Sequence, residues 1–442
     1  MPGRKVIIVG SGLGGLECGL LLARRGFDVT VLEQDSAIGG CLRSYRRGDL
    51  TLDTGIHCVG DLEEGGELRG IVRELGLDGL PWERMAGEEV VFGDERFFLP
   101  SGYDALADAL KGYFPASEAE IDQYLSVIRE APGHPEWMGR SAYEFLCGTV
   151  SDPLLRNVLS GTSLKMHLDA ETLPLYVFAR INGSFVHSIW RLPGGGQQIA
   201  DTIAGQIKAL GGEVLTGEKV TSLVTSEGRV VEVQTASGMR CEADFVISDA
   251  HPSVTVSLVD GGLRRVYAGR VKSLRNSFGM FTASLRLREG MIPYLDRNVY
   301  VHDAGADLWH PRTDRPESVM VCFGNQRDGF ARSVDLMAPC PADVPDREAF
   351  AQALIDKVSG RFPTLAGAVE TVYTSTPRTW ERYTATPDGS AYGVMKDWNN
   401  NIVTVLSPRT PLENLFLTGQ SLALHGVLGV SKTAWRTVNE IL

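Results

Sequence analysis

The sequence predicts an α/β protein built on a Rossmann-type dinucleotide-binding unit at its N-terminus. Residues 6–9 read VIIV, a β-branched run typical of a strand that is buried on both faces. The glycine loop GSGLGG follows at residues 10–15, and the apolar pattern after it predicts a helix through residue 26. A second strand over residues 29–32 ends at Glu33. A strand, a glycine loop, a helix and an acid after the next strand together form the dinucleotide fingerprint.

Each part of this unit has a physical task. Gly10 permits the tight turn, Gly12 lets backbone amides approach a pyrophosphate, and Gly15 lets the helix pack closely on the strand. The free N–H groups at the helix N-terminus face the phosphates. Glu33 can accept hydrogen bonds from the adenosine ribose, and its charge disfavours the 2′-phosphate of NADP. The expected cofactor-binding residues here are Gly10, Ser11, Gly12, Gly14, Gly15, Glu33 and Gln34.

The segments that follow favour a flavin over a nicotinamide. A second glycine pair at residues 39–40 precedes Arg43 and the run LDTGIHCVGDLEEGG at residues 52–66. This region resembles the phytoene desaturase, carotenoid isomerase and retinol saturase group of flavoproteins, and the run is most similar to the retinol saturase branch. The resemblance extends over most of the chain, through RLPGGGQQIADTIA at 191–204, TPDGSAYG at 386–393, NLFLTGQ at 414–420 and LHGVLGV at 424–430.

The resemblance implies FAD as the cofactor and a fold like that of the flavin amine oxidases and phytoene desaturases. A Rossmann-type FAD-binding domain (1–80, 192–248 and 407–442) would interleave with an α+β substrate-binding domain (81–191 and 249–406). The helix after residue 426 would place its N-terminus near the flavin ring. The further cofactor-binding residues that it implies are Gly39, Gly40, Leu42, Arg43, Gly55, His57, Val220, Gly419, Gln420, Gly426 and Val427.

Local patterns predict the elements of both domains. In the cofactor domain we expect a helix over 200–210 and strands over 213–216, 219–225, 229–235 and 243–248. In the substrate domain we expect a hairpin of 89–92 and 96–99, helices over 103–113, 118–130 and 348–358, strands over 277–287 and 318–323, and a proline-punctuated loop over 339–345.

His57 and His425 are the candidate catalytic residues because each lies in a segment that resembles a flavin-approaching motif. A histidine there could hydrogen-bond the flavin or deliver a proton to a substrate carbon, and the alternative is a structural role. Residues 178–190 alternate aromatic and apolar side chains, so Phe185, His187 and Trp190 are candidate substrate contacts; the alternative is an ordinary core strand. The sequence contains no Ser-His-Asp, Cys-His or metal-type cluster.

The leading hypothesis is an FAD-dependent oxidoreductase that transfers hydride between flavin N5 and carbon–carbon bonds of a conjugated apolar polyene such as a carotenoid or retinoid. Two alternatives also use reduced flavin but give a different product. One is a cis–trans isomerase, which causes no net redox change, and the other is a reductive cyclase, in which reduction leads to ring closure. An amine oxidase is a further relative, but residues 421–430 offer no aromatic pair to hold an amine. A non-catalytic lipid-binding escort is also an alternative, although such a protein would not need the intact glycine loops.

The composition of the chain limits the kinds of partner that the protein is expected to bind. The 442-residue chain has a formal net charge of −12 and lacks basic runs, which argues against nucleic acid. Seven cysteines without Cys-x-x-Cys spacing favour reduced thiols in a cytoplasm, and no long apolar run or signal segment is present. We therefore expect a cytoplasmic protein with a small apolar substrate. The sequence leaves open a peripheral membrane contact and the oligomeric state.

Overall fold

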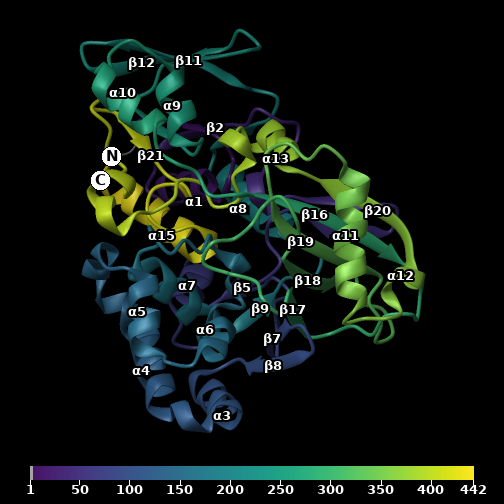
Figure 1. The fold of residues 1–442 in the computed structure, drawn as a ribbon. Coiled ribbons are helices and arrows are strands. Elements are labelled where there is room, and N and C mark those ends of the chain that lie inside the picture. The colour runs from purple at the N-terminus through teal and green to yellow at the C-terminus, as the bar shows by residue number, and fades with distance from the viewer. Residues whose placement is uncertain (1–2) are drawn as a thin grey trace.

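The computed structural model describes residues 3–442, and a five-stranded parallel sheet carries the N-terminal motif (Figure 1). Its strands, in spatial order, are β10 (Glu213–Leu215), β2 (Asp28–Leu32), β1 (Lys5–Val9), β14 (Phe245–Ser248) and β21 (Leu415–Leu417). These strands come from the three chain segments that the sequence assigns to the cofactor domain.

Strand β1 is buried on both faces, as its β-branched run predicts. Val6 and Ile8 face a core that includes residues of three helices, α1 (Leu13–Ala23), α8 (Gln197–Ala209) and α15 (Gly426–Asn439). Ile7 and Val9 belong to a second core, shared with a four-stranded sheet. That sheet contains β13 (Arg240–Cys241), β12 (Arg229–Thr235), β11 (Val220–Ser226) and β15 (Val259–Asp260).

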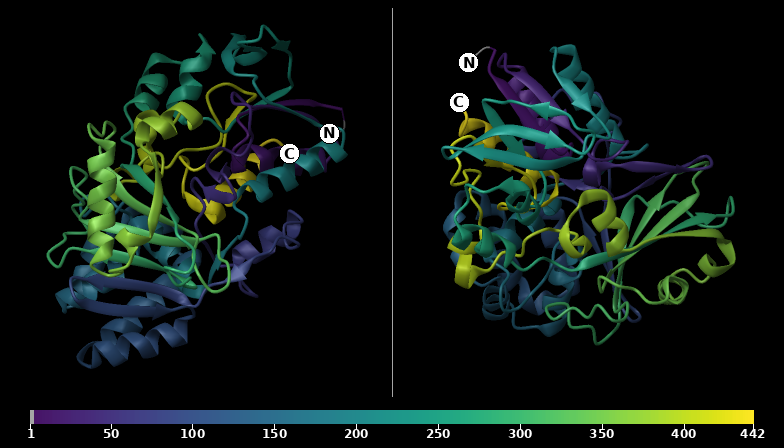
Figure 2. Two further views of the ribbon diagram at one scale, coloured as in Figure 1. Left: turned by 90° about the vertical axis from the view of Figure 1, so that its right-hand side faces the viewer. Right: turned by 90° about the horizontal axis from the view of Figure 1, so that it is seen from above.

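A seven-stranded mixed sheet forms the opposite part of the molecule; in Figure 2 its strands from residues 279–375 are green and its strands from residues 87–100 are blue. Its spatial order is β20 (Val369–Ser375), β16 (Gly279–Leu287), β19 (Ser333–Cys340), β18 (Ser318–Gly324), β17 (Arg297–His302), β7 (Gly87–Phe92) and β8 (Glu95–Pro100). One face packs its apolar side chains against α11 (Arg347–Ser359). Because side chains alternate across a strand, the other face presents a different set, which includes Met280, Met320 and Met337.

The segment that the sequence presents as an aromatic wall or a core strand is a helix, so the strand interpretation of residues 178–190 is wrong. α7 spans Leu175–His187, and only the short β9 (Ile189–Arg191) follows it. The apparent alternation conceals a helical period, because Ile181, Ser184 and Phe185 share one face. The expected loop at 339–345 also starts later, since β19 continues to Cys340.

Helices α3 to α7 pack together in one helical layer at the lower left of Figure 1. The preceding members are α3 (Tyr103–Tyr113), α4 (Glu118–Glu130), α5 (Ala142–Thr149) and α6 (Pro153–Ser160). The predicted hairpin is confirmed as β7 and β8, and the two predicted helices of this region are confirmed as α3 and α4. None of the helices in residues 3–442 combines the length and apolar character that a membrane span requires.

Helices α1 and α15 are joined by a buried carboxyl group. Glu17 on α1 accepts a hydrogen bond from the Ser431 hydroxyl on α15 at 2.7 Å, while its second oxygen has no partner among residues 3–442. Burial raises the pKa of Glu17 to about 8, and the Ser431 hydrogen bond only partly opposes it. The group is therefore protonated in the folded protein at neutral pH.

This carboxyl is expected to make stability fall with rising pH. Between the ordinary pKa of 4.5 and about 8, unfolding releases the Glu17 proton, so alkali favours the unfolded chain by up to about 1.4 kcal/mol per pH unit. Chemical unfolding of wild type and Glu17→Gln at pH 5, 6.5 and 8 measures the effect. The variant should gain stability relative to wild type as pH rises; a constant difference would contradict the assignment.

Candidate functional site

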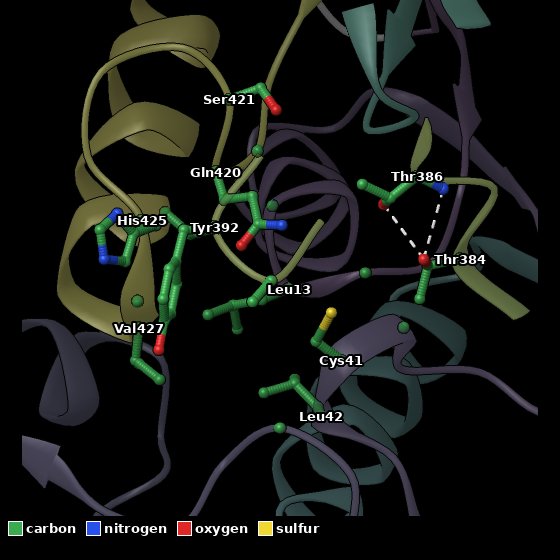
Figure 3. Close-up of a pocket in the computed structure, with 18 of the residues that line it drawn as sticks. Leu13, Cys41, Leu42, Thr384, Thr386, Tyr392, Gln420, Ser421, His425 and Val427 are labelled. Carbon is green, nitrogen blue, oxygen red and sulfur yellow. Dashed lines mark hydrogen bonds between the residues drawn. The ribbon is translucent and has the colours of Figure 1, made fainter. Parts of the chain in front are cut away.

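A cavity of about 510 Å³ lies between the five-stranded sheet, α7 and the seven-stranded sheet. The β1–α1 loop forms one end and the methionine face of the seven-stranded sheet contributes to the other walls. Figure 3 shows Tyr392, His425 and Gln420 on one side of this cavity, with Cys41 and Leu42 across from them. Eighteen sequence-predicted residues line it: Gly10, Ser11, Gly12, Gly14, Glu33, Gln34, Gly39, Gly40, Leu42, Gly55, His57, Phe185, Val220, Gly419, Gln420, His425, Gly426 and Val427.

The glycine loop is shaped by backbone contacts that leave no room for side chains. Gly10 has a φ of +97°, a conformation that favours glycine at the turn after β1. A Cβ on Gly15 would lie 2.3 Å from the Gly10 carbonyl oxygen, so this glycine serves helix–strand packing and does not line the cavity. A Cβ on Gly40 would lie 3.2 Å from the Gly12 Cα, so the two glycine segments touch.

Asp249 lies at the same helix N-terminus and was missed by the sequence analysis. It follows β14 and lines the cavity, and its partly buried carboxyl group accepts backbone hydrogen bonds from Gly15 and Gly12. Burial raises its pKa to about 7; the nearby charge of Glu33 adds to the rise, and the two amides oppose it. The carboxyl thus occupies the place where unpaired helix N–H groups attract an anion.

Glu33 directly follows β2, and neighbouring backbone N–H groups hold its carboxylate in place. Its carboxylate accepts hydrogen bonds from the backbone N–H of Ser11 at 3.1 Å and of Asp35 at 2.9 Å. Arg43 does not reach the cavity wall; its guanidinium pairs with Asp35 at 2.8 Å and lies 3.8 Å from Glu33. The structure therefore gives Arg43 a supporting position behind Glu33, where the sequence suggested direct contact with phosphate or flavin.

His57 and His425 both line the cavity, and both are neutral at pH 7 because burial lowers the pKa of each to about 4. The Nε2 of His57 has no hydrogen-bond partner among residues 3–442. His425 precedes α15, donates from Nε2 to the Lys165 carbonyl at 3.0 Å, and packs on the Tyr392 ring at 4.5 Å between centroids. Neutral imidazoles can donate and accept hydrogen bonds but are poor proton donors.

The structure places one of the three candidate substrate contacts at the cavity and the other two away from it. Phe185 lines the cavity from α7, whereas His187 and Trp190 do not. The Nδ1 of His187 lies 2.8 Å from Asp61, and Trp190 lies in β9, paired with Val59 of β5 (Val59–Gly60). The apolar wall is completed by residues that sequence reasoning did not single out: Leu164, Ile181, Met280, Met320, Met337 and Leu424.

The residues present fit a flavin dinucleotide. The cradle at Gly12, Gly14 and Gly419 admits backbone but no side chain, because a Cβ on any of them would lie within 2.7 Å of an Asp249 oxygen. Glu33 offers acceptors at one end of the cavity. At the other end, the unpartnered His57 Nε2 and the uncapped start of α15 offer polar groups for a ring system. Within residues 3–442 no cluster of three metal-ligating side chains occurs.

Comparisons with known proteins agree with this reading. The family model described as flavin containing amine oxidoreductase matches residues 13–442. The all-trans-retinol 13,14-reductase of Homo sapiens is 26% identical, covering 99% of this chain and 85% of the human protein. A 4,4'-diapophytoene desaturase (4,4'-diapolycopene-forming) of Methylomonas sp is 24% identical, covering 64% of this chain and 61% of its own length.

A solved structure of an oxidoreductase from Methanosarcina mazei superimposes with a TM-score of 0.74 at 16% identity, covering 98% of this chain and all of that one. At this identity the likeness concerns the fold alone. Together with the family match, these relatives confirm the resemblance seen in the sequence and the FAD cofactor that it implies. The chain belongs to the flavin-containing amine oxidoreductase family and is an FAD-dependent oxidoreductase.

Proposed function

We propose that this enzyme oxidises or reduces carbon–carbon bonds of a conjugated, apolar polyene. The observation that carries the proposal is the continuity of the cavity, which runs from the glycine cradle and Glu33 to a wall of methionines and Phe185. Curated relatives are named for retinol reduction and for carotenoid desaturation, which are opposite directions of one chemistry. When bound, FAD supplies the ring that accepts or donates the hydride.

The chain's own residues would position the reactants and keep water out. We propose that Gly10, Gly12, Gly14, Gly39, Gly40 and Gly419 hold the pyrophosphate by backbone, and that Glu33 holds the ribose. The start of α15 would favour negative charge on the ring. His57 and His425, being neutral, would orient groups by hydrogen bonds. The thioether side chains of the methionine face would adapt to the shape of a long substrate.

The proposal is tested with the purified, FAD-loaded protein and all-trans-retinol as the probe. We expect the two-band absorbance of oxidised flavin, its loss on anaerobic reduction, and its return when the polyene is added, with a product two mass units heavier. A desaturase would instead lose the absorbance on adding substrate to oxidised protein and would give a product two mass units lighter. An isomerised product of unchanged mass, or no reaction with retinol or carotenoids in either direction, would overturn the proposal.

Filling the methionine face is expected to block the substrate but not the cofactor. Met320→Trp should lower turnover by about tenfold to a hundredfold, because a polyene displaced from the ring by even an ångström reacts poorly. Met320 is buried and lines the cavity, whereas Met291 is 40% exposed. Met291→Trp is therefore the matched control and should retain full turnover. A Met320→Trp enzyme with wild-type turnover would show that the polyene does not occupy this face.

We also propose that the enzyme works in the cytoplasm and meets membranes from one side. All seven cysteines are unpaired, as expected in a reducing compartment. A polyene substrate would partition into lipid, so the enzyme would collect it at a bilayer surface. Sedimentation with phosphatidylcholine vesicles, with and without retinol, tests the contact; protein that stays in the supernatant in both cases would overturn it.

A further inference from the structure

One buried ion pair reaches the cavity wall through its lysine. Lys165, the last residue of the short 3₁₀ turn η5 (Ser163–Lys165), places its Nζ 2.7 Å from Glu88 on β7. Both side chains are only 6% exposed. Tyr300 on β17 donates its hydroxyl proton to the other Glu88 oxygen, also at 2.7 Å. Each oxygen of the carboxylate therefore has a hydrogen-bond donor.

Lys165 itself is not saturated. Its ammonium carries three N–H donors, and among residues 3–442 its one hydrogen bond is the contact with Glu88. The Phe185 ring covers a second direction, with its centroid 4.1 Å from Nζ. Lys165 and Phe185 both line the cavity. A third donor is thus available at the wall where the apolar substrate is proposed to lie.

We propose that Lys165, neutralised by Glu88, is a docking point for a neutral oxygen group, a hydroxyl or a carbonyl, on the substrate. This inference rests on the proposed function. An unused donor in an apolar site is costly, and a ligand oxygen would remove that cost. A hydrocarbon end offers no acceptor. A carboxylate would bring a second negative charge beside Glu88, whose own charge the single ammonium already balances.

The position of Lys165 also bears on which bond reacts. Its backbone carbonyl accepts the hydrogen bond from His425, and the neighbouring Leu164 carbonyl accepts one from Tyr392. His425 directly precedes α15, whose uncapped N-terminus lines the cavity at the end assigned to the flavin ring. A substrate held by Lys165 would therefore present the double bonds closest to its oxygen for reaction, with its apolar remainder on the methionine face.

The test is a binding titration of the FAD-loaded protein with three probes of one carbon skeleton. These are all-trans-retinol, all-trans-retinoic acid, and the hydrocarbon with a methyl group in place of the hydroxymethyl group. Perturbation of the bound flavin absorbance reports binding. We expect the alcohol to bind about tenfold to a hundredfold more tightly than the hydrocarbon, the range of a hydrogen bond to a charged group. The acid should bind more weakly than the alcohol.

Two variants distinguish the contribution of the Lys165 charge from that of the Glu88 charge. Lys165→Met combined with Glu88→Gln keeps the site neutral and should bring the alcohol to the affinity of the hydrocarbon. Glu88→Gln alone leaves the lysine charge unbalanced and should reverse the preference, so that the acid binds more tightly than the alcohol. Lys208→Met, at an exposed position of α8, should change neither. Tyr300 can still donate to the glutamine oxygen, which preserves the local packing.

Equal binding of alcohol and hydrocarbon by wild type would overturn the inference, as would an alcohol preference that survives in the double variant or no binding of any probe. Turnover is scored separately. Selective binding of retinol, with no reaction of retinol or carotenoids in either direction, would refute the proposed function and leave the docking point standing. If the enzyme reacts with the alcohol and the hydrocarbon and binds both with equal affinity, the docking point is refuted and the proposed function stands.

Discussion

Gly15→Ala is expected to weaken FAD binding about a hundredfold, whereas Gly70→Ala is expected to be harmless. Both glycines lie inside helices, Gly15 in α1 and Gly70 in α2 (Glu67–Glu74), so both variants gain the same helix propensity. A Cβ on Gly70 meets nothing within 4 Å. A Cβ on Gly15 lies 2.3 Å from the Gly10 carbonyl oxygen and 3.2 Å from Ile8.

The neighbour that must move is backbone in the turn that shapes the cradle. Overpacking against such a neighbour costs about 3 kcal/mol, which corresponds to about a hundredfold loss of affinity if the cradle absorbs the distortion. Gly70→Ala should instead stabilise the protein by about 0.5 to 1 kcal/mol. Flavin content after purification and the unfolding midpoint of each variant measure both effects. Wild-type flavin content in Gly15→Ala would show that close helix–strand packing does not set the cradle.

The cradle could be predicted from the sequence because its determinants are local. The strand, turn, helix and acid follow one another within one short segment, and each residue type serves a backbone requirement that is visible without tertiary structure. Gly10 adopts the positive φ that its turn requires, and Glu33 ends the next strand as predicted. For the same reason the element predictions held where periodicity was strong, as in α3, α4 and the β7–β8 hairpin.

The residues that sequence reasoning missed depend on distant partners. Lys165 lies 77 positions from Glu88, which lies 212 positions from Tyr300, so no local pattern connects the three. Residues 178–190 misled for a different reason: their aromatic side chains mimic a period of two, but the cavity-facing positions follow the helical period. One signal for Asp249 was available, because it follows a strand that pairs in parallel with β1, and ligands collect at that strand edge.

Asp249 is expected to make FAD binding depend on pH near neutrality. Its pKa of about 7 is raised mainly by burial, and its carboxyl group faces the amides of Gly15 and of Gly12, one of the glycines proposed to hold the pyrophosphate. Bringing phosphate charge to this place raises the pKa further, so above pH 7 binding must take up a proton. The dissociation constant of FAD should be level below pH 6 and should then increase by up to about tenfold per pH unit above 7.

Titration of the FAD-stripped protein with FAD between pH 5.5 and 9, followed by quenching of flavin fluorescence, gives this slope. Asp249→Asn carries no titrating proton, so its affinity should be level across the range and should exceed that of wild type at pH 9. Asp28→Asn, at the exposed start of β2, changes a carboxyl of the same sheet and should keep the wild-type slope. A slope that persists in Asp249→Asn would assign the proton to another buried group. An affinity of wild type that does not change with pH would mean that the carboxyl group and the pyrophosphate do not share this helix N-terminus. If they did share it, the affinity for FAD would have to change with pH, because the carboxyl group titrates at about 7.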